Sequence, residues 1–406
     1  MTLCPFEDAA VAHLAPLALT RAVYDLRVGA RTLLERAQAA FPADRLALHT
    51  RAELAGMAAH EHPEAGAIAG DTLFVNGRWL VTPGDVTARL DRARAAGQPV
   101  AIVQGETRLA VWHPAPPAPL AAAPGEASLG GIETLQVEGQ TVVTHLWDLI
   151  ADLGARLAED LEAMGGLGQH DGTVEPGATL VRAEHVHLAP GSIVRAGAVV
   201  SAASGPVWLA EGAEVGENAV VKGPVWLGPG AAVKPAGRVD ESAIGERSKV
   251  GGEVHGSIVH SLSSKGHDGY LGNSYLGRWC NLGADTNTSN LKNDYGEVTV
   301  WDAVAGDYLP SGRQFVGLFM GDHSKCSINT MFNTGTVVGV FCNLFGSGFP
   351  PRYVPSFAWG GADGLTPYRT DKAVRVAEAV MARRDQTLSE AERARLAEIA
   401  RQSGVA

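Results

Sequence analysis

The chain has 406 residues, of which 46% are hydrophobic, 19% charged and 6% aromatic, and its net charge is −11. This apolar composition excludes a disordered chain. The sequence has no run of 18 or more apolar residues, so no membrane span is predicted. The negative charge disfavours nucleic acid as a partner. Four Cys without a CxxC spacing, and no recognisable secretory signal, predict a cytoplasmic protein. Glycine makes up 49 residues, about 12% against a typical ~7%, and this excess needs a cause.

Residues 1–164 are predicted to form an α/β domain, because helical and strand patterns alternate as in a parallel sheet. The Pro- and Ala-rich stretch 113–127 is expected to be an exposed loop within it. In chain order we expect a helix over 30–40, a helix start at the capping box Thr50–Glu53, a strand over 73–75, a helix over 85–96 closed by Gly97, a strand over 100–103 and a helical stripe over 146–161.

Residues 165–361 carry an internal repeat. The motif Gly205–Leu209 recurs as Gly223–Leu227, 18 residues later, and an aliphatic residue returns every six positions. This hexapeptide period predicts a left-handed parallel β-helix, with three hexads to a coil and Gly or Asn at corners of positive φ. The inward-pointing positions form three runs: Leu188, Val194, Val200; Leu209, Val215, Val221, Leu227, Val233, Val239; and Met320, Cys326, Phe332, Val338, Leu344.

Residues 362–406 are predicted to be a helical tail. The stretch 371–402 is rich in Ala, Arg and Glu, and Ser389 with Glu392 forms a capping box. We expect these helices to cover the last coil, whose edge would otherwise be unpaired.

The hexapeptide order fails between Val250 and Met320, where polar side chains are dense. A β-helix does not need such side chains to fold, so the break predicts a functional site. It contains His267, Tyr270-Leu271-Gly272, Asn281–Thr286 and Asn290.

With these spacings the break resembles the acetyltransferase domain of the bifunctional family that makes UDP-N-acetylglucosamine. More specifically, the chain is similar to an alternative bacterial branch of that family, described as sugar nucleotidyltransferases. The similarity extends over most of the chain and is more specific in its C-terminal half. It rests also on Leu17–Gly29, Asn76-Gly77-Arg78, Trp147-Asp148-Leu149, Ser289–Asn293 and Gly317–Lys325.

The resemblance implies acetyl transfer from acetyl-CoA to an amino-sugar phosphate or nucleotide-sugar, in a trimer with the acetyl-CoA groove between subunits. The resemblance also implies that the protein takes part in cell envelope biosynthesis. A base must take the amine proton, and an imidazole can do so at neutral pH. By resemblance His267 is that base, and the acceptor sugar is held by Tyr270, Asn281, Asn290 and Lys292.

The chain departs from the family where a Lys binds the sugar phosphate one coil before the base. His255 stands near that position, with Arg247, Lys249 and Lys265 close by. The nucleotide, sugar and acyl group therefore stay open.

The front domain is expected to be nucleotidyltransferase-like, although the Gly-rich phosphate loop of ordinary nucleotidyltransferases is missing. Arg21 and Arg27 can bind phosphate, and Asp25 can hold Mg²⁺. Asn76 and Arg78 are further candidates for nucleotide binding. The alternative is an Arg–Asp pair that only fixes a turn, in a catalytically inactive domain.

Two other hypotheses assign the protein to different functional classes. A trimeric γ-carbonic-anhydrase-like zinc enzyme would use His255 and His260, with His267 or His323 as third ligand. A non-catalytic trimeric scaffold would keep its hexapeptides regular, and the polar break argues against it.

Overall fold

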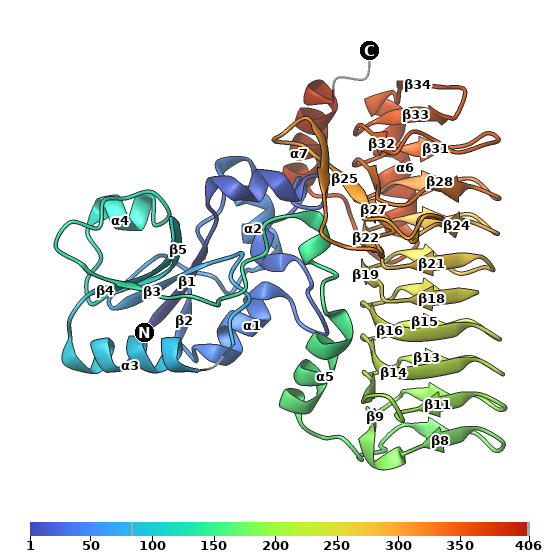
Figure 1. Ribbon diagram of the computed structural model, residues 1–406, viewed down its shortest axis with the longest axis horizontal. Coiled ribbons are helices and arrows are strands. Elements are labelled where there is room, and N and C mark those ends of the chain that lie inside the picture. Colours follow the sequence, from blue (N-terminus) through green and yellow to red (C-terminus); the bar gives the residue numbers. More distant parts are fainter. Residues whose placement is uncertain (83, 404–406) are drawn as a thin grey trace. The chain divides into compact units, whose positions relative to one another are not determined.

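The computed structural model describes residues 1–82 and 84–403, which form two compact units (Figure 1). The first unit comprises Met1–Leu14, Thr20–Leu26 and Arg31–Thr144. The second comprises Ala15–Leu19, Arg27–Ala30 and His145–Ala406, of which 404–406 lie outside the described residues. None of the described helices is both long and apolar enough to cross a membrane.

The first unit is built on a six-stranded sheet of order β2-β1-β3-β5-β4-β6. The strands β2, β1 and β3 are parallel, but β5 runs antiparallel to both β3 and β4. The sheet is therefore mixed, and the predicted parallel arrangement is confirmed only for part of it. The reason is local: Gly105 and Glu106 join β4 to β5 as a tight hairpin, with Gly105 at φ 58°, and a two-residue turn reverses the chain. The strands are β1 (Thr2–Phe6), β2 (Arg45–Leu46), β3 (Thr72–Asn76), β4 (Val100–Gln104), β5 (Thr107–His113) and β6 (Glu133–Gln136).

The helices of the first unit follow the predicted pattern in part. Helix α3 (Asp85–Ala96) ends as expected at Gly97, which is left-handed at φ 69°. The stretch after Thr50 begins as a 3₁₀ turn (Ala52–Leu54) before α2 (Ala55–Glu61), and the capping box lies instead at Thr32 and Glu35 of α1 (Leu33–Ala40). A short helix, α4 (Ala118–Ala122), interrupts the expected loop.

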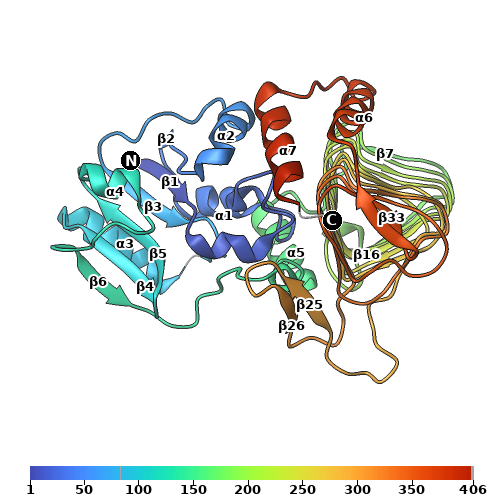
Figure 2. The ribbon, with the colours of Figure 1, turned by 90° about the horizontal axis from the view of Figure 1, so that it is seen from above.

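The second unit is a left-handed parallel β-helix, as predicted. In Figure 2 its coils lie on top of one another. The repeat is confirmed directly, because Val207, Trp208 and Leu209 pair with Val225, Trp226 and Leu227 of the next coil. One column of strands consists of β7 (Thr173–Val174), β10 (Ile193–Val194), β13 (Glu214–Val215), β15 (Ala232–Val233), β17 (Lys249–Val250), β20 (Ser264–Lys265), β23 (Asn281–Leu282), β28 (Lys325–Cys326), β31 (Asn343–Leu344) and β33 (Ala358–Gly361).

The other strands form two further columns. The second column holds β8 (Thr179–Val181), β11 (Val199–Ser201), the first parts of β14 (Val220–Leu227) and β16 (Arg238–Ile244), β18 (Glu253–His255) and β21 (Tyr270–Gly272), and β24 (Asn287–Thr288) and β29 (Met331–Phe332) continue it. The third holds β9 (Val186–Leu188), β12 (Val207–Leu209), the ends of β14 and β16, β19 (Ile258–Ser261), β22 (Tyr275–Arg278), β27 (Leu318–Met320), β30 (Thr336–Val338) and β32 (Tyr353–Val354).

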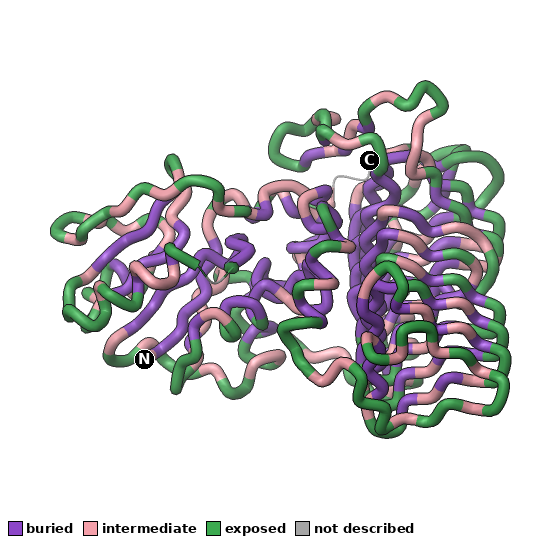
Figure 3. The backbone as a smooth tube through the Cα atoms, turned by 60° about the horizontal axis from the view of Figure 1, so that its bottom comes forward, coloured by how far each residue is buried: buried purple, intermediate pink, exposed green. Residues whose placement is uncertain are grey.

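The predicted inward residues form a single continuous core. Val194, Val215 and Leu227 are fully buried, and Cys326 and Leu344 extend the same cluster towards the C-terminal coils. Figure 3 shows exposed residues (green) at the outer turns of the coils and buried residues (purple) along the stretches between them. The aliphatic stack is therefore the main source of hydrophobic stabilisation in this unit.

The corners differ from the prediction, because large residues as well as Gly and Asn adopt positive φ. Trp279, His323, Phe341 and Phe357 all do so, at φ 58–62°. Their rings stack from coil to coil, with His323 and Phe341 centroids 4.7 Å apart and Phe341 and Phe357 centroids 5.4 Å apart. Stacking and burial offset the strain of a left-handed backbone.

The C-terminal helices pack on this aromatic ladder. Ala373, Ala377 and Met381 of α6 (Thr370–Ala382) and Leu396 and Ile399 of α7 (Glu390–Gln402) bury against it. The predicted capping box of Ser389 and Glu392 is confirmed. The helices therefore cover a side of several coils, whereas the edge of the last coil is paired by β34 (Gly364–Pro367), antiparallel to β33.

Two segments outside the coils border the break in the repeat. Helix α5 (Leu153–Met164) packs on β14 and β16 within the second unit. Residues 289–316 replace a corner, and within them β25 (Thr299–Asp302) and β26 (Asp307–Pro310) form an antiparallel hairpin.

We expect Leu227→Ala to lower the free energy of unfolding by about 2–5 kcal/mol, because it removes a fully buried side chain from a stack that cannot collapse. Lys222→Ala on the same strand is the control and should change it by less than about 0.5 kcal/mol, since Lys222 is exposed. Denaturant titration measures both. Equal effects would contradict the inward assignment.

Candidate functional site

The break in the repeat retains the β-helix fold. Lys249 pairs with Ser264, Ser264 with Asn281, and Asn281 with Lys325, which are steps of 15, 17 and 44 residues along the chain. The unequal steps explain why the hexapeptide pattern disappears while the coils continue. Only the step of 44 adds residues, and these form an insertion that holds Asn290 and Lys292.

His267 lies at the corner between β20 and β21, and its side chain is exposed. Lys265, two residues before it, points into the core and is 1% exposed. Its Nζ donates to the backbone oxygens of His267 at 2.6 Å and Asp268 at 3.0 Å. The sequence singled out the His but missed the role of the Lys, because Lys at a normally apolar position is visible only once the register is known.

The fold brings together Tyr270 and Asn290, two of the residues that the resemblance assigns to the acceptor sugar. Asn290 Nδ2 donates to the Tyr270 hydroxyl at 3.1 Å and to Asn273 Oδ1 at 2.7 Å. The Tyr270 ring lies across Gly272, where a Cβ would collide with the hydroxyl. Burial raises the pKa of Tyr270, so the hydroxyl keeps its proton at neutral pH and can donate to a ligand.

The other two acceptor-site candidates lie elsewhere. Asn281 is exposed on β23, in register with Ser264 rather than with Tyr270. Lys292 Nζ donates to the backbone oxygen of Glu297 at 2.8 Å, within the insertion. Within the described residues, 1–82 and 84–403, neither Asn281 nor Lys292 makes a hydrogen bond to Tyr270 or Asn290.

An oriented imidazole lies on the strand column of Tyr270. His255 Nδ1 is 2.6 Å from Asp240 Oδ1, and the register places Gly272 on the other side of His255. The hydrogen bond to Asp240 raises the pKa of His255. The sequence noted His255, but Asp240 lies 15 residues earlier, and only the pairing of β16 with β18 brings it into contact.

A cavity of about 520 Å³ opens at the corner that follows these strands. Glu241, Gly256 and Asn273, which directly follow Asp240, His255 and Gly272, form part of its wall, and Arg313 of the insertion faces them. Asn273 links the cavity to the Tyr270–Asn290 network. The full lining is Ile150, Asp152, Leu153, Gly154, Ala155, Glu241, Gly256, Asn273, Gly312, Arg313, Gln314 and Phe315.

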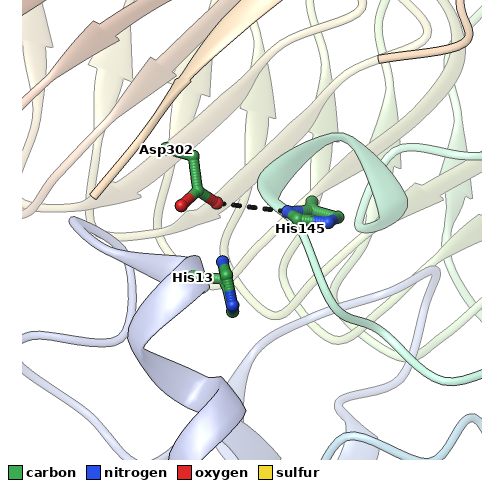
Figure 4. A group of neighbouring side chains, drawn as sticks. All are labelled: His13, His145 and Asp302. Carbon is green, nitrogen blue, oxygen red and sulfur yellow. Dashed lines mark hydrogen bonds and ion pairs between the residues drawn. The ribbon is translucent and has the colours of Figure 1, made fainter. Parts of the chain in front are cut away.

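The insertion is held to the second unit by a second His–Asp pair. His145 Nδ1 is 3.2 Å from Oδ2 of Asp302, which is 1% exposed and lies at the end of β25 (Figure 4). The His145 ring stacks on Trp147, with centroids 4.4 Å apart. Asp302 lies beside the turn between β25 and β26, so this pair fixes the tip of the hairpin.

The proposed histidine ligands of a zinc enzyme are not gathered within one chain. His255 is bound to Asp240, and His260 Nδ1 lies 3.1 Å from Ser261 Oγ. Among the described residues, the groups of three that could hold a metal contain neither histidine.

In the first unit, polar side chains gather at the carboxyl ends of the parallel strands β1 and β3. The Arg78 guanidinium donates to both oxygens of Asp8, at 2.7 Å each, and to the Val143 backbone oxygen. Asn76 donates to Asp8 as well, at 2.7 Å. Burial acts to raise the pKa of Asp8, but the hydrogen bonds from Arg78 and Asn76 bring it below its usual value.

Asn76 and Arg78 are therefore engaged within the protein. They are 1% and 3% exposed, and most of the Arg78 donors are used. The sequence predicted them as nucleotide ligands, but residue type alone does not tell whether a donor faces a ligand or a buried carboxylate.

Asp25 lies in a group that suits a divalent cation. The ligand atoms of Asp25, Glu61 and His62 lie within 4.8 Å of one another. His62 Nε2 is 2.8 Å from Asp25 Oδ1, and this hydrogen bond raises the pKa of His62 to about 9. Carboxylates fit Mg²⁺, whereas the added imidazole fits Mn²⁺ or Zn²⁺ as well.

Arg21 and Arg27 belong to different units. Arg21 is buried in the first unit, at 2% exposure. Arg27 stacks on Trp226 of the β-helix, 4.2 Å from the ring centroid, and its backbone N–H donates to the Tyr275 hydroxyl. A packing role therefore accounts for Arg27.

Comparison with known proteins agrees with the prediction that the front domain is nucleotidyltransferase-like. Residues 3–166 match the family described as "Sugar nucleotidyl transferase". This confirms the resemblance. The chain is 33% identical over 102 residues to the "Bifunctional sugar-1-phosphate nucleotidylyltransferase/acetyltransferase" of Sulfurisphaera tokodaii, covering 25% of each chain. It is 36% identical over 90 residues to the "Bifunctional protein GlmU" of Methanocaldococcus jannaschii, covering 22% of this chain and 21% of that protein.

The chain thus matches about a quarter of the length of these curated relatives. Among solved structures, a UDP-N-acetylglucosamine acyltransferase matches 50% of this chain and 74% of its own, at 12% identity and TM-score 0.23. The polySia-specific acetyltransferase NeuO matches 53% and 97%, at 12% identity and TM-score 0.22.

We expect Arg78→Gln to lower the free energy of unfolding by about 3–5 kcal/mol, because it leaves the Asp8 carboxylate without its buried partner. Arg89→Gln, on the exposed Arg89–Asp85 pair of α3, should cost only about 0.3–0.5 kcal/mol. Unchanged stability in Arg78→Gln would restore a ligand-binding role for this residue.

Proposed function

We propose that the protein is a bifunctional transferase. Its β-helix transfers an acetyl group from acetyl-CoA to the amine of an amino-sugar phosphate or nucleotide-sugar. Its front domain joins a sugar 1-phosphate to a nucleotide, in a synthesis of the UDP-N-acetylglucosamine type. The family match of residues 3–166 supports the second activity, and the Sulfurisphaera tokodaii relative carries both activities in its name.

The observation that carries the acetyl transfer is the hydrogen-bonded chain from Tyr270 through Asn290 to Asn273, beside the 520 Å³ cavity. Hydroxyl and amide groups in such a chain suit the hydroxyl groups of a sugar. The cavity adds a cation, because the Arg313 guanidinium makes no side-chain hydrogen bond or ion pair with residues 1–82 and 84–403. The Arg313 guanidinium suits the acceptor's phosphate. The carboxylates of Asp152 and Glu241 in the same cavity suit the hydroxyl or amino groups of the acceptor.

His267 acts in this proposal as the general base. The acceptor nitrogen attacks the thioester carbonyl as the imidazole takes its proton, and the C–S bond breaks to release the thiol of coenzyme A, which recovers a proton. Tyr270 starts β21 three residues after His267, so the proposed base and the proposed sugar-binding hydroxyl belong to the same coil. Asn281 and Lys292 stay assigned to the acceptor site by resemblance.

For the nucleotidyl transfer, we propose that Asp25 holds Mg²⁺ together with Glu61 and His62, which supplies charge neutralisation for the phosphates. Arg21, Arg27, Asn76 and Arg78 stay candidates by resemblance, although the contacts of Arg27, Asn76 and Arg78 favour packing roles. An inactive front domain is the second candidate, and the engaged Asn76 and Arg78 favour it.

The proposed assembly is a homotrimer, with acetyl-CoA bound between subunits along the coils. Since acetyl-CoA and nucleoside triphosphates are cytoplasmic metabolites, we place the reactions in the cytoplasm, in the supply of nucleotide sugars for the cell envelope.

Thiol release from acetyl-CoA should depend on an amino-sugar phosphate or amino nucleotide-sugar and should fall roughly 10²–10⁴-fold in His267→Ala, the typical contribution of a general base. A thiol-trapping dye follows the reaction. His170→Ala, at another exposed imidazole of the β-helix, should leave the rate unchanged. Full activity of His267→Ala would remove His267 as the base.

Pyrophosphate release from UTP and N-acetylglucosamine 1-phosphate should require a divalent cation. It should fall about 10–100-fold in Asp25→Asn, because the variant weakens the proposed metal group. Asp91→Asn on the exposed face of α3 is the control. No release with any common nucleoside triphosphate would establish the inactive front domain instead.

A further inference from the structure

Lys265 stands at an interior position of the β-helix. It pairs in register with Val250 of the preceding coil, and the same column continues with Leu282 and Cys326, which pair with each other. Like these neighbours it is buried, at 1% exposure. An ammonium group in this stack loses its hydration, which is costly unless its hydrogen bonds are replaced.

The replacement comes from the corner that follows. Nζ binds the backbone oxygens of His267 and Asp268, at 2.6 and 3.0 Å. The charged groups that act on the ammonium are Asp268 and Asp285, together with the Cys326 thiol. Burial is the larger influence and lowers the pKa of Lys265 to about 8.

The corner is otherwise weakly constrained by its sequence. Gly266 and Gly269 flank His267 and Asp268, and Gly269 adopts φ 107°, where L side chains rarely go. Glycines leave a backbone with many accessible conformations. The Lys265 ammonium reaches this corner from inside the core and holds two successive carbonyl groups.

We propose that Lys265 is a positioning residue for acyl transfer, which fixes the corner peptide so that the His267 imidazole stays aligned with the acceptor amine. This inference rests on the proposed role of His267. It assigns the buried Lys to the geometry of the base and not to the stability of the coils.

Lys265→Met tests the proposal, because Met fills a similar volume without a donor. Leu282→Met is the matched control, a volume-conserving change in the next coil. We expect Lys265→Met to fold with a Tm at or above that of the wild type and to lose about 10–100-fold in kcat with little change in the acceptor KM. Leu282→Met should keep kcat.

The pH dependence separates positioning from packing. Below pH 8 the wild-type ammonium is charged, so the ratio of wild-type to Lys265→Met kcat should be largest there and should shrink above pH 8. The stability of the wild type relative to Lys265→Met changes in the opposite direction, because it rises with pH while the kcat ratio falls. Between pH 8 and about 10.4, the unfolded chain binds the proton that the folded chain has released, so the wild type gains stability relative to Lys265→Met as pH rises.

Hydrogen exchange of the amides at 266–269 gives a readout without activity. We expect faster exchange in Lys265→Met, after correction for intrinsic rates, and faster exchange in the wild type above pH 8. If Lys265→Met fails to fold, the wild-type exchange profile decides alone, and a corner equally protected on both sides of pH 8 overturns the proposal.

Failure of this inference is distinct from failure of the proposed function. Inactive His267→Ala with normal kcat and pH profile in Lys265→Met overturns the positioning role only. Fully active His267→Ala overturns the function of His267, whatever the exchange of the corner shows.

Discussion

The hydrogen bonds between successive coils constrain everything else in the second unit. Strands inside each column pair with the coils before and after them, so their side chains alternate between the interior and the surface, and the interior positions are mostly apolar. The aliphatic stack satisfies this constraint along the whole β-helix. It also leaves the chain free to vary at corners, where the pairing does not depend on the length of the connection.

The candidate chemistry lies where the chain uses that freedom. His267 is on a glycine-flanked corner, Tyr270 crosses the face of a strand made bare by Gly272, and Arg313 comes from an insertion that replaces a corner. A rigid scaffold with variable corners can therefore position a base, a sugar-binding network and a cation with little cost to its core.

Charged side chains within the two units are mostly committed to one another. Arg78 with Asp8, His255 with Asp240, and His145 with Asp302 are each close pairs at least partly removed from water. Such pairs fix segments that the backbone alone leaves loose, namely the ends of β1 and β3, a strand column beside the cavity, and the hairpin of the insertion. An Arg or a protonated His without such a carboxylate partner can bind phosphate, so the contacts of these residues matter more than their identity.

The sequence by itself determined the β-helix, the 18-residue step between the two repeated motifs, the inward residues, helix α3 and the capping box of α7, because these follow from local periodicity and local end signals. It also predicted a site in the break of the repeat. Only the tertiary structure decided the mixed sheet, the ladder of large corner residues, and the partners of Arg27, His255 and Lys265. The physical reason is register: coil steps of 15, 17 and 44 residues decide which side chains meet, and no local pattern encodes those steps.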